Sequence, residues 1–168
     1  KHGLAVAQEI RDTIQIIQAL NNIGTDYRRM SILDDASDYH YKALAVSDAY
    51  TDKTSSVSVK NRVVSLNGIG NVQLSLGNPL EAEKVFREAL KGETLLGSHL
   101  GMAINYANIG AILEEREQVD SARIYYAESL RCNELAGSDL GISLCHTHFG
   151  RLYENEGNLD QAISEYKL

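Results

Sequence analysis

The sequence predicts an all-α protein, a solenoid of antiparallel helix pairs, and three observations lead to this prediction. The stretch LLGSHLGMA at residues 95–103 returns 40 positions later as LAGSDLGIS at residues 135–143. Between these stretches, apolar and small residues recur with the 3.6-residue period of a helix. The 168 residues contain one proline, the residue that interrupts helices. Self-similarity at a period of roughly 20–50 residues is typical of repeat architectures.

The first helix of each repeat is marked by a glycine that follows a large apolar residue. The pairs are Ile23-Gly24, Ile69-Gly70, Ile109-Gly110 and Phe149-Gly150, at steps of 46, 40 and 40 residues. A glycine inside a helix costs up to about 1 kcal/mol relative to alanine. Glycines at four matching positions therefore indicate that a second helix packs closely against each first helix.

The second helix of each repeat carries a small residue twelve positions after the glycine and a ring four positions later. The small residues are Ala36, Ala82, Ala122 and Ala162, and the rings four positions later are His40, Phe86, Tyr126 and Tyr166. In the second copy, Ala82, Phe86, Ala89 and Leu90 fall at i, i+4, i+7 and i+8, which is one face of a helix. This face is expected to pack on the glycine-bearing helix.

Turn residues separate the helices. Gly77-Asn78-Pro79 and Gly157-Asn158 lie within pairs, and the two repeated stretches connect one pair to the next. Ser98 and Ser138 are expected to cap the helices that follow them. The six extra residues of the longer step fall near residues 51–62, where we expect a longer loop or a helix extension.

These signals define one array over residues 1–168. Residues 1–11 are expected to be the second helix of a preceding repeat. The four repeats then occupy residues 14–50, 58–96, 99–136 and 139–168, the last of them truncated. Because the chain begins with Lys1 and stops inside a helical pattern, we expect a piece of a longer protein.

Composition narrows the classes of partner. The net charge of −7 disfavours direct contact with nucleic acid, which needs a basic surface. No apolar run approaches the roughly 20 residues that a membrane helix needs, so no membrane partner is expected. Cys132 and Cys145 are too few for a disulfide scaffold, and they are expected to be reduced and packed.

The first-helix pattern small-x-x-large-x-x-large-Gly, followed by Ala-x-x-x-aromatic-x-x-Ala, resembles the tetratricopeptide repeat. The usual unit of that family is about 34 residues. The 40-residue unit is similar to the longer variety of Pins-like and kinesin-light-chain-like scaffolds and of bacterial regulators. The resemblance implies a right-handed superhelix in which first helices line a concave groove. Pins-like first helices read A-x-x-N-L-G, and residues 20–24 and 106–110 are close to this pattern, whereas Gly68 and His148 replace the asparagine.

The resemblance also implies which residues face the groove. We expect the peptide-binding set to be Asn21, Asn22, Thr25, Arg28, Arg29, Asn67, Asn71, Asn108, His148 and Arg151. A carboxamide both donates and accepts hydrogen bonds, so the asparagines suit a peptide backbone. The arginines suit carboxylates. The alternative is that these are ordinary solvated positions.

No motif predicts catalysis, a metal or a cofactor. Cys145-His146-Thr147-His148 resembles a metal motif, but residues two apart on a helix point about 200° apart, so the two histidines cannot share an ion. Gly68-Ile69-Gly70 follows no strand and is not a phosphate loop. We therefore expect a protein that is not an enzyme, binds no metal and needs no cofactor.

The sequence thus predicts a non-catalytic, cytoplasmic protein-interaction module whose concave groove binds a peptide or a partner helix. An alternative is a sensory or regulatory segment of a larger bacterial signalling protein, such as a histidine kinase or a helix-turn-helix transcription regulator. Aspartyl-phosphate phosphatases also resemble these arrays, but their additional helical bundle is not visible in this sequence. Self-association through the exposed array ends is a further possibility.

Overall fold

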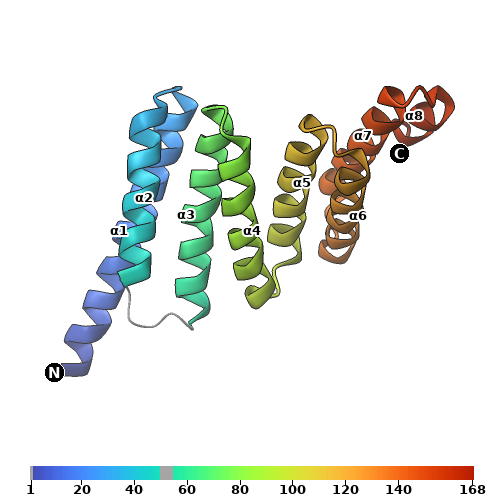
Figure 1. Cartoon of the computed structure of the whole chain (residues 1–168). Helices are drawn as coiled ribbons and strands as arrows, with labels where there is room; N and C mark the ends of the chain where they lie inside the picture. Colours follow the sequence, from blue (N-terminus) through green and yellow to red (C-terminus); the bar gives the residue numbers. More distant parts are fainter. Residues whose placement is uncertain (1, 50–54) are drawn as a thin grey trace. The chain divides into compact units, whose positions relative to one another are not determined.

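The computed structural model describes residues 2–49 and 55–168, with side chains described from Thr13 onward within these ranges. All regular secondary structure in these ranges is α-helical, which confirms the predicted fold class (Figure 1). The chain divides into two compact units, Lys1–Leu96 and Gly97–Leu168.

Unit 1 contains two helix pairs. The helices are α1 (His2–Arg29), α2 (Leu33–Ala49), α3 (Ser56–Ser75) and α4 (Pro79–Leu96). Helix α2 packs against both α1 and α3, α3 also packs against α4, and α1 contacts α3 directly (Figure 1). A core cluster of Val63, Leu66 and Ile69 from α3 with Val85 and Ala89 from α4 holds the second pair together.

Unit 2 also contains two helix pairs. The helices are α5 (His99–Glu115), α6 (Val119–Ala136), α7 (Asp139–Asn155) and α8 (Leu159–Glu165). Helix α6 packs against both α5 and α7, and α8 packs against α7 (Figure 1). Ile109, Ile112 and Tyr126 are buried where α5 meets α6.

The close packing predicted from the four glycines is confirmed. In each pair, the ring of the second helix lies where a glycine Cβ would be. That Cβ would fall 2.9 Å from His40 at Gly24, 2.6 Å from Phe86 at Gly70, 2.8 Å from Tyr126 at Gly110 and 2.4 Å from Tyr166 at Gly150. Each glycine therefore gives space to a ring, and this close packing offsets its low helix propensity.

The caps predicted for the repeated stretches are also confirmed. The Oγ atoms of Ser98 and Ser138 accept hydrogen bonds of 3.2 Å from the backbone N–H groups of Gly101 and Gly141. Gly137 ends α6 with a φ of 65°, a left-handed conformation that suits glycine. Each stretch thus ends one helix and starts the next.

Two expectations near the start of the chain have different outcomes. The helix boundary expected between residues 11 and 14 is absent, because α1 is continuous from His2 to Arg29. In the repeat alignment, Arg11 takes the place of Gly137, so the residue that favours a helix end is missing. The assignment of residues 1–11 to a preceding repeat stays a prediction.

Helix α3 begins at Ser56, so part of the longer step is a helix extension, and residues 50–54 lie outside the described residues.

Candidate functional site

A groove opens between α5 and α7 in unit 2, with a volume of about 250 Å³. We call it the α5–α7 groove. Helix α5 contributes Leu100, Ala103, Ile104 and Ala107; α7 contributes Leu140, Gly141, Leu144, Cys145 and His148; and Ser129, Asn133 and Ser138 complete the lining.

Exposed aliphatic side chains form the rim of the α5–α7 groove. Leu100 is 50% exposed, Ile104 51%, Leu140 74% and Leu144 53%. Residues four apart share one face of a helix, so each helix presents two of them to the groove. A gathering of large apolar side chains around one concavity is typical of an interaction surface.

Hydrogen bonds link Ser129, Asn133 and Cys145 at the floor of the α5–α7 groove. Ser129 Oγ donates to the carbonyl of Ala103 at 2.8 Å, and Cys145 Sγ donates to Ser129 Oγ at 3.4 Å. The carboxamide of Asn133 donates to Cys145 Sγ at 3.5 Å. Because these bonds are internal, an apolar occupant leaves them intact.

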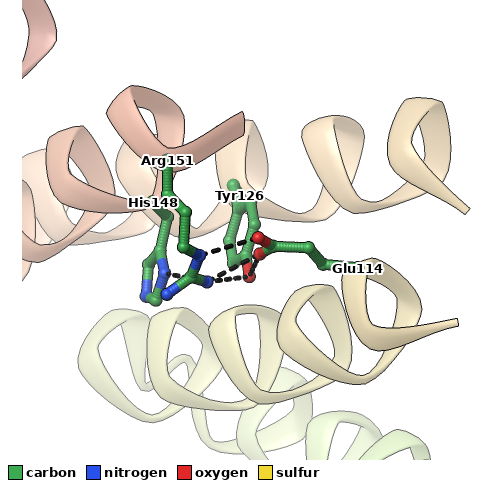
Figure 2. A network of polar contacts seen from close by, with 4 residues as sticks. All are labelled: Glu114, Tyr126, His148 and Arg151. Carbon is green, nitrogen blue, oxygen red and sulfur yellow. Dashed lines mark hydrogen bonds and ion pairs between the residues drawn. The ribbon is translucent and has the colours of Figure 1, made fainter. Parts of the chain in front are cut away.

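Figure 2 shows a network of four polar side chains, Glu114, Tyr126, His148 and Arg151. Arg151 of α7 binds Glu114 of α5 through two hydrogen bonds, from Nε to Oε1 at 2.7 Å and from Nη2 to Oε2 at 2.6 Å. Tyr126 of α6 donates its hydroxyl to Glu114 Oε2 at 2.7 Å. This bidentate pair links the two helices that wall the groove.

The environment fixes the protonation states in this network. Burial favours the neutral form of Glu114, but hydrogen bonds from Arg151 and Tyr126 outweigh it and lower the pKa of Glu114. Burial and the Glu114 carboxylate raise the pKa of Tyr126. Burial and the charge of Arg151 lower the pKa of His148. At neutral pH, Glu114 is therefore charged, while Tyr126 and His148 are neutral.

His148 of α7 also packs against α6. Its ring stacks on the Tyr126 ring, with centroids 4.4 Å apart and planes 3° from parallel. The equivalent repeat position in unit 1 is Gly68, where a Cβ would lie 2.3 Å from the His40 ring. Glycine thus brings α3 into contact with the ring of α2, whereas an imidazole holds α7 away from the ring of α6.

A second hollow lies in unit 1, with a volume of about 710 Å³ between α2, α3 and α4. Several of the charged side chains on its walls are paired within the chain. Arg62 binds Asp48 at 2.7 Å and also binds Glu88, and Lys84 binds Glu81 at 2.9 Å. It is larger than the α5–α7 groove, and Lys91 on its wall forms no ion pair with another described residue.

Two kinds of function find no support within the described ranges. No group of three histidine, cysteine or acidic side chains there could hold a metal ion. The two histidines of the metal-like motif have different partners, since His146 Nδ1 lies 2.8 Å from Glu165 while His148 contacts Tyr126 and Arg151. No helix in these ranges combines the length and apolar character needed to cross a bilayer.

Comparison with known proteins identifies the family. Residues 61–134 and residues 145–168 match tetratricopeptide repeat families, and together they cover more than half of the chain. The chain belongs to the tetratricopeptide repeat (TPR) family. None of the curated proteins compared with it matches the chain.

Solved structures share the TPR fold. BtubC (BKLC) from P. vanneervenii is 18% identical, with a TM-score of 0.78 over 90% of this chain and 60% of that chain. Aspartyl phosphate phosphatase F from Bacillus subtilis is 14% identical, with a TM-score of 0.81 over 90% of this chain and 38% of the other. The Rap conjugation gene regulator of plasmid pLS20, solved with the Phr* peptide, is 14% identical, with a TM-score of 0.74 over 96% of this chain and 43% of that chain. This chain thus spans 60% or less of each of these proteins, and identities this low show the fold alone.

The groove residues predicted in unit 1 have varied environments. Asn21 is 4% exposed, and its carboxamide contacts His40 Nδ1 and Ser65 Oγ, each at 2.9 Å, so it belongs to the core of this TPR unit. Asn22 and Arg29 are exposed, and Arg29 lies 3.7 Å from Asp26. The remaining four are half-buried: Thr25, Arg28, Asn67 and Asn71.

In unit 2, the structure brings two predicted residues together. His148 lines the α5–α7 groove, and Arg151 Nη2 lies 3.2 Å from its Nδ1. The chain itself supplies the carboxylate expected for Arg151, in the form of Glu114. Asn108 is half-buried on α5, one turn from Ile104.

The aliphatic rim was missed by sequence reasoning, although a signal for it exists. Leu100 and Leu140 recur within the repeated stretches, and each is followed four residues later by another large aliphatic residue. When these stretches are read as connections alone, their contribution to the rim of the α5–α7 groove is overlooked.

Proposed function

We propose that this TPR chain is a non-catalytic protein-interaction module that binds a peptide or partner helix in the α5–α7 groove. The observation that carries the proposal is the set of four half-exposed aliphatic side chains around one concavity. Concave surfaces of stacked helical repeats are commonly used for binding.

The size of the groove favours a side chain over a small molecule. Small-molecule sites usually have volumes of about 300–1,000 Å³. The α5–α7 groove, at about 250 Å³, is smaller. It suits one or two anchoring side chains of a longer ligand, the arrangement in which a few buried contacts provide most of the binding energy.

The polar network supports binding rather than catalysis. Glu114 is engaged by Arg151 and Tyr126, and the described contacts give it no nucleophile to activate. The pair instead fixes the spacing between α5 and α7. Asn108, one turn from Ile104, extends the proposed surface with a polar contact for a peptide backbone.

A regulatory segment of a larger bacterial signalling protein is the second candidate. The fold likeness to the Rap regulator solved with the Phr* peptide favours it. The neighbouring domains of the parent protein discriminate between the candidates, because a kinase or a DNA-binding domain would assign the groove to signal reception.

A selection from displayed random peptides tests the proposed function. The baits are the unmodified chain, Leu144→Glu, which places a charge in the groove, and Leu95→Glu as the control. Leu95 is 80% exposed in unit 1, so its substitution perturbs the fold no more than that of Leu144. We expect the unmodified chain and the control to enrich the same sequences and Leu144→Glu to lose them. Equal enrichment by all three baits, or none, would contradict the proposal.

A further inference from the structure

We propose that the ligand of the α5–α7 groove is a peptide with an aliphatic anchor, and that a main-chain carbonyl beside this anchor accepts a hydrogen bond from Nε2–H of His148. The inference rests on the proposed function and specifies its ligand. In this inference, His148 contacts the main chain of the ligand, and the aliphatic rim contacts its anchoring side chain.

The contact with Arg151 determines which nitrogen of His148 carries the proton. Arg151 Nη2 lies 3.2 Å from His148 Nδ1, and a guanidinium can only donate. Nδ1 must therefore accept, and the proton of the neutral ring resides on Nε2. Nε2 makes no hydrogen bond with another described residue, so its N–H group is left for a ligand.

The ring is held in place before any ligand arrives. One face stacks on Tyr126 at 4.4 Å, and Arg151 fixes the orientation through Nδ1 (Figure 2). Arg151 is itself held by two bonds to Glu114, whose side chain is only 11% exposed. A donor oriented in advance loses little conformational freedom on binding, which favours its use in recognition.

Charge balance favours a carbonyl over a carboxylate. Arg151 is the cation beside His148, and Glu114 neutralises it at 2.6–2.7 Å. The burial that lowers the pKa of His148 keeps the ring uncharged at neutral pH. An incoming carboxylate would therefore lose its hydration without meeting a net positive charge. A neutral carbonyl loses less hydration free energy on entering the same site.

The groove lining favours an aliphatic anchor. The walls carry Leu100, Ile104, Leu140 and Leu144, and hydrogen bonds link Ser129, Asn133 and Cys145 at the floor. Leucine, isoleucine, valine or methionine can fill such a space without breaking these bonds. A charged side chain would be desolvated in this groove without an opposite charge to pair with.

The test uses the random-peptide selection on the unmodified chain, followed by affinity measurements on the enriched peptides. His148→Phe keeps a ring to stack on Tyr126 but removes the Nε2 donor, and Thr147→Ala is the neighbouring control on an exposed position. We expect the enriched peptides to share an aliphatic residue without acidic preference. Their dissociation constants should rise about fivefold for His148→Phe and stay unchanged for Thr147→Ala. Nitrogen-15 NMR of the His148 ring provides a second readout, which should show the Nε2–H tautomer and a shifted Nε2–H signal with peptide.

The outcomes separate the inference from the proposed function. Groove-dependent peptides that bind His148→Phe as tightly as the unmodified chain would overturn the inference and leave the function standing. A consensus of acidic residues, or an Nδ1–H tautomer, would overturn it equally. Failure to enrich any peptide that depends on Leu144 would overturn both.

Discussion

Acidification from pH 7 to pH 5 is expected to destabilise unit 1 through one buried histidine. The ring of His40 is 1% exposed and is covered by the backbones of α1 and α3 at Gly24 and Gly68. Its Nδ1 lies 2.9 Å from Asn21 Oδ1, and its Nε2 is buried without a hydrogen-bond partner among the described residues. Burial, with the nearby charge of Arg28, lowers the pKa of His40 from 6.5 to about 4.

The sign and size of the effect follow from this pKa. Between pH 6.5 and about pH 4, the unfolded chain binds a proton at His40 that the folded chain does not, so the free energy of unfolding falls as the pH falls. The lowered pKa corresponds to about 3 kcal/mol in total, of which about 2 kcal/mol is lost between pH 7 and pH 5. Above pH 6.5 the contribution is fully present.

Urea unfolding followed by circular dichroism at both pH values measures this loss. His40→Phe removes the titrating group and places in the first repeat the ring type that Phe86 provides in the second. On acidification, we expect the free energy of unfolding of this variant to fall by about 2 kcal/mol less than that of the unmodified chain. His99→Phe, at an exposed position, is the control and should behave like the unmodified chain. An unchanged loss in His40→Phe would refute the reasoning.

Three further changes have defined outcomes. Gly68→Ala would place a methyl carbon 2.3 Å from the His40 ring, so we expect the free energy of unfolding in urea to fall by about 2 kcal/mol despite the helix propensity of alanine. A gain in stability would contradict the close packing at Gly68. The control Gly157→Ala, at a position with a φ of 78° and open space, should lose only about 1 kcal/mol of this free energy. A double-mutant cycle of Glu114→Gln and Arg151→Gln should give a coupling energy of about 1 kcal/mol that decreases with salt, and additive effects would show that the pair does not link α5 to α7. Cys132 and Cys145 are buried and form no disulfide, and burial raises the pKa of Cys132. Both thiols should therefore react with a thiol reagent far more slowly in the folded chain than in the urea-unfolded chain. Equal reaction rates would show that the thiols are not packed.

Local pattern was sufficient to predict the helix pairs. The spacing between each glycine and its ring reports a contact between two helices of the same pair, and Gly110 with Tyr126 shows this contact in the structure. The caps at Ser98 and Ser138 depend only on residues three positions away. Such features depend on short stretches of chain, so a single sequence reveals them.

The composition of the groove depends on contacts between repeats, which the family pattern does not specify. Asn21 lies on the stripe expected to face a ligand, yet it is buried because Gly68 allows α3 to approach and Ser65 to bond with it. Arg151 was expected to bind a ligand carboxylate, but Glu114 lies within its reach across the groove. These outcomes depend on contacts between neighbouring repeats, such as those of Gly68 with His40 and of His148 with Tyr126.

Methyl NMR of the chain labelled at isoleucine and leucine, titrated with the most strongly enriched peptide, tests the central claim most directly. If the α5–α7 groove is the binding site, the methyl signals of Leu100, Ile104, Leu140 and Leu144 will shift together and saturate at one peptide concentration, while the signal of Leu95 stays in place. Shifts centred on Leu95 and its neighbours in the unit 1 hollow, with the four rim residues unmoved, would contradict the account.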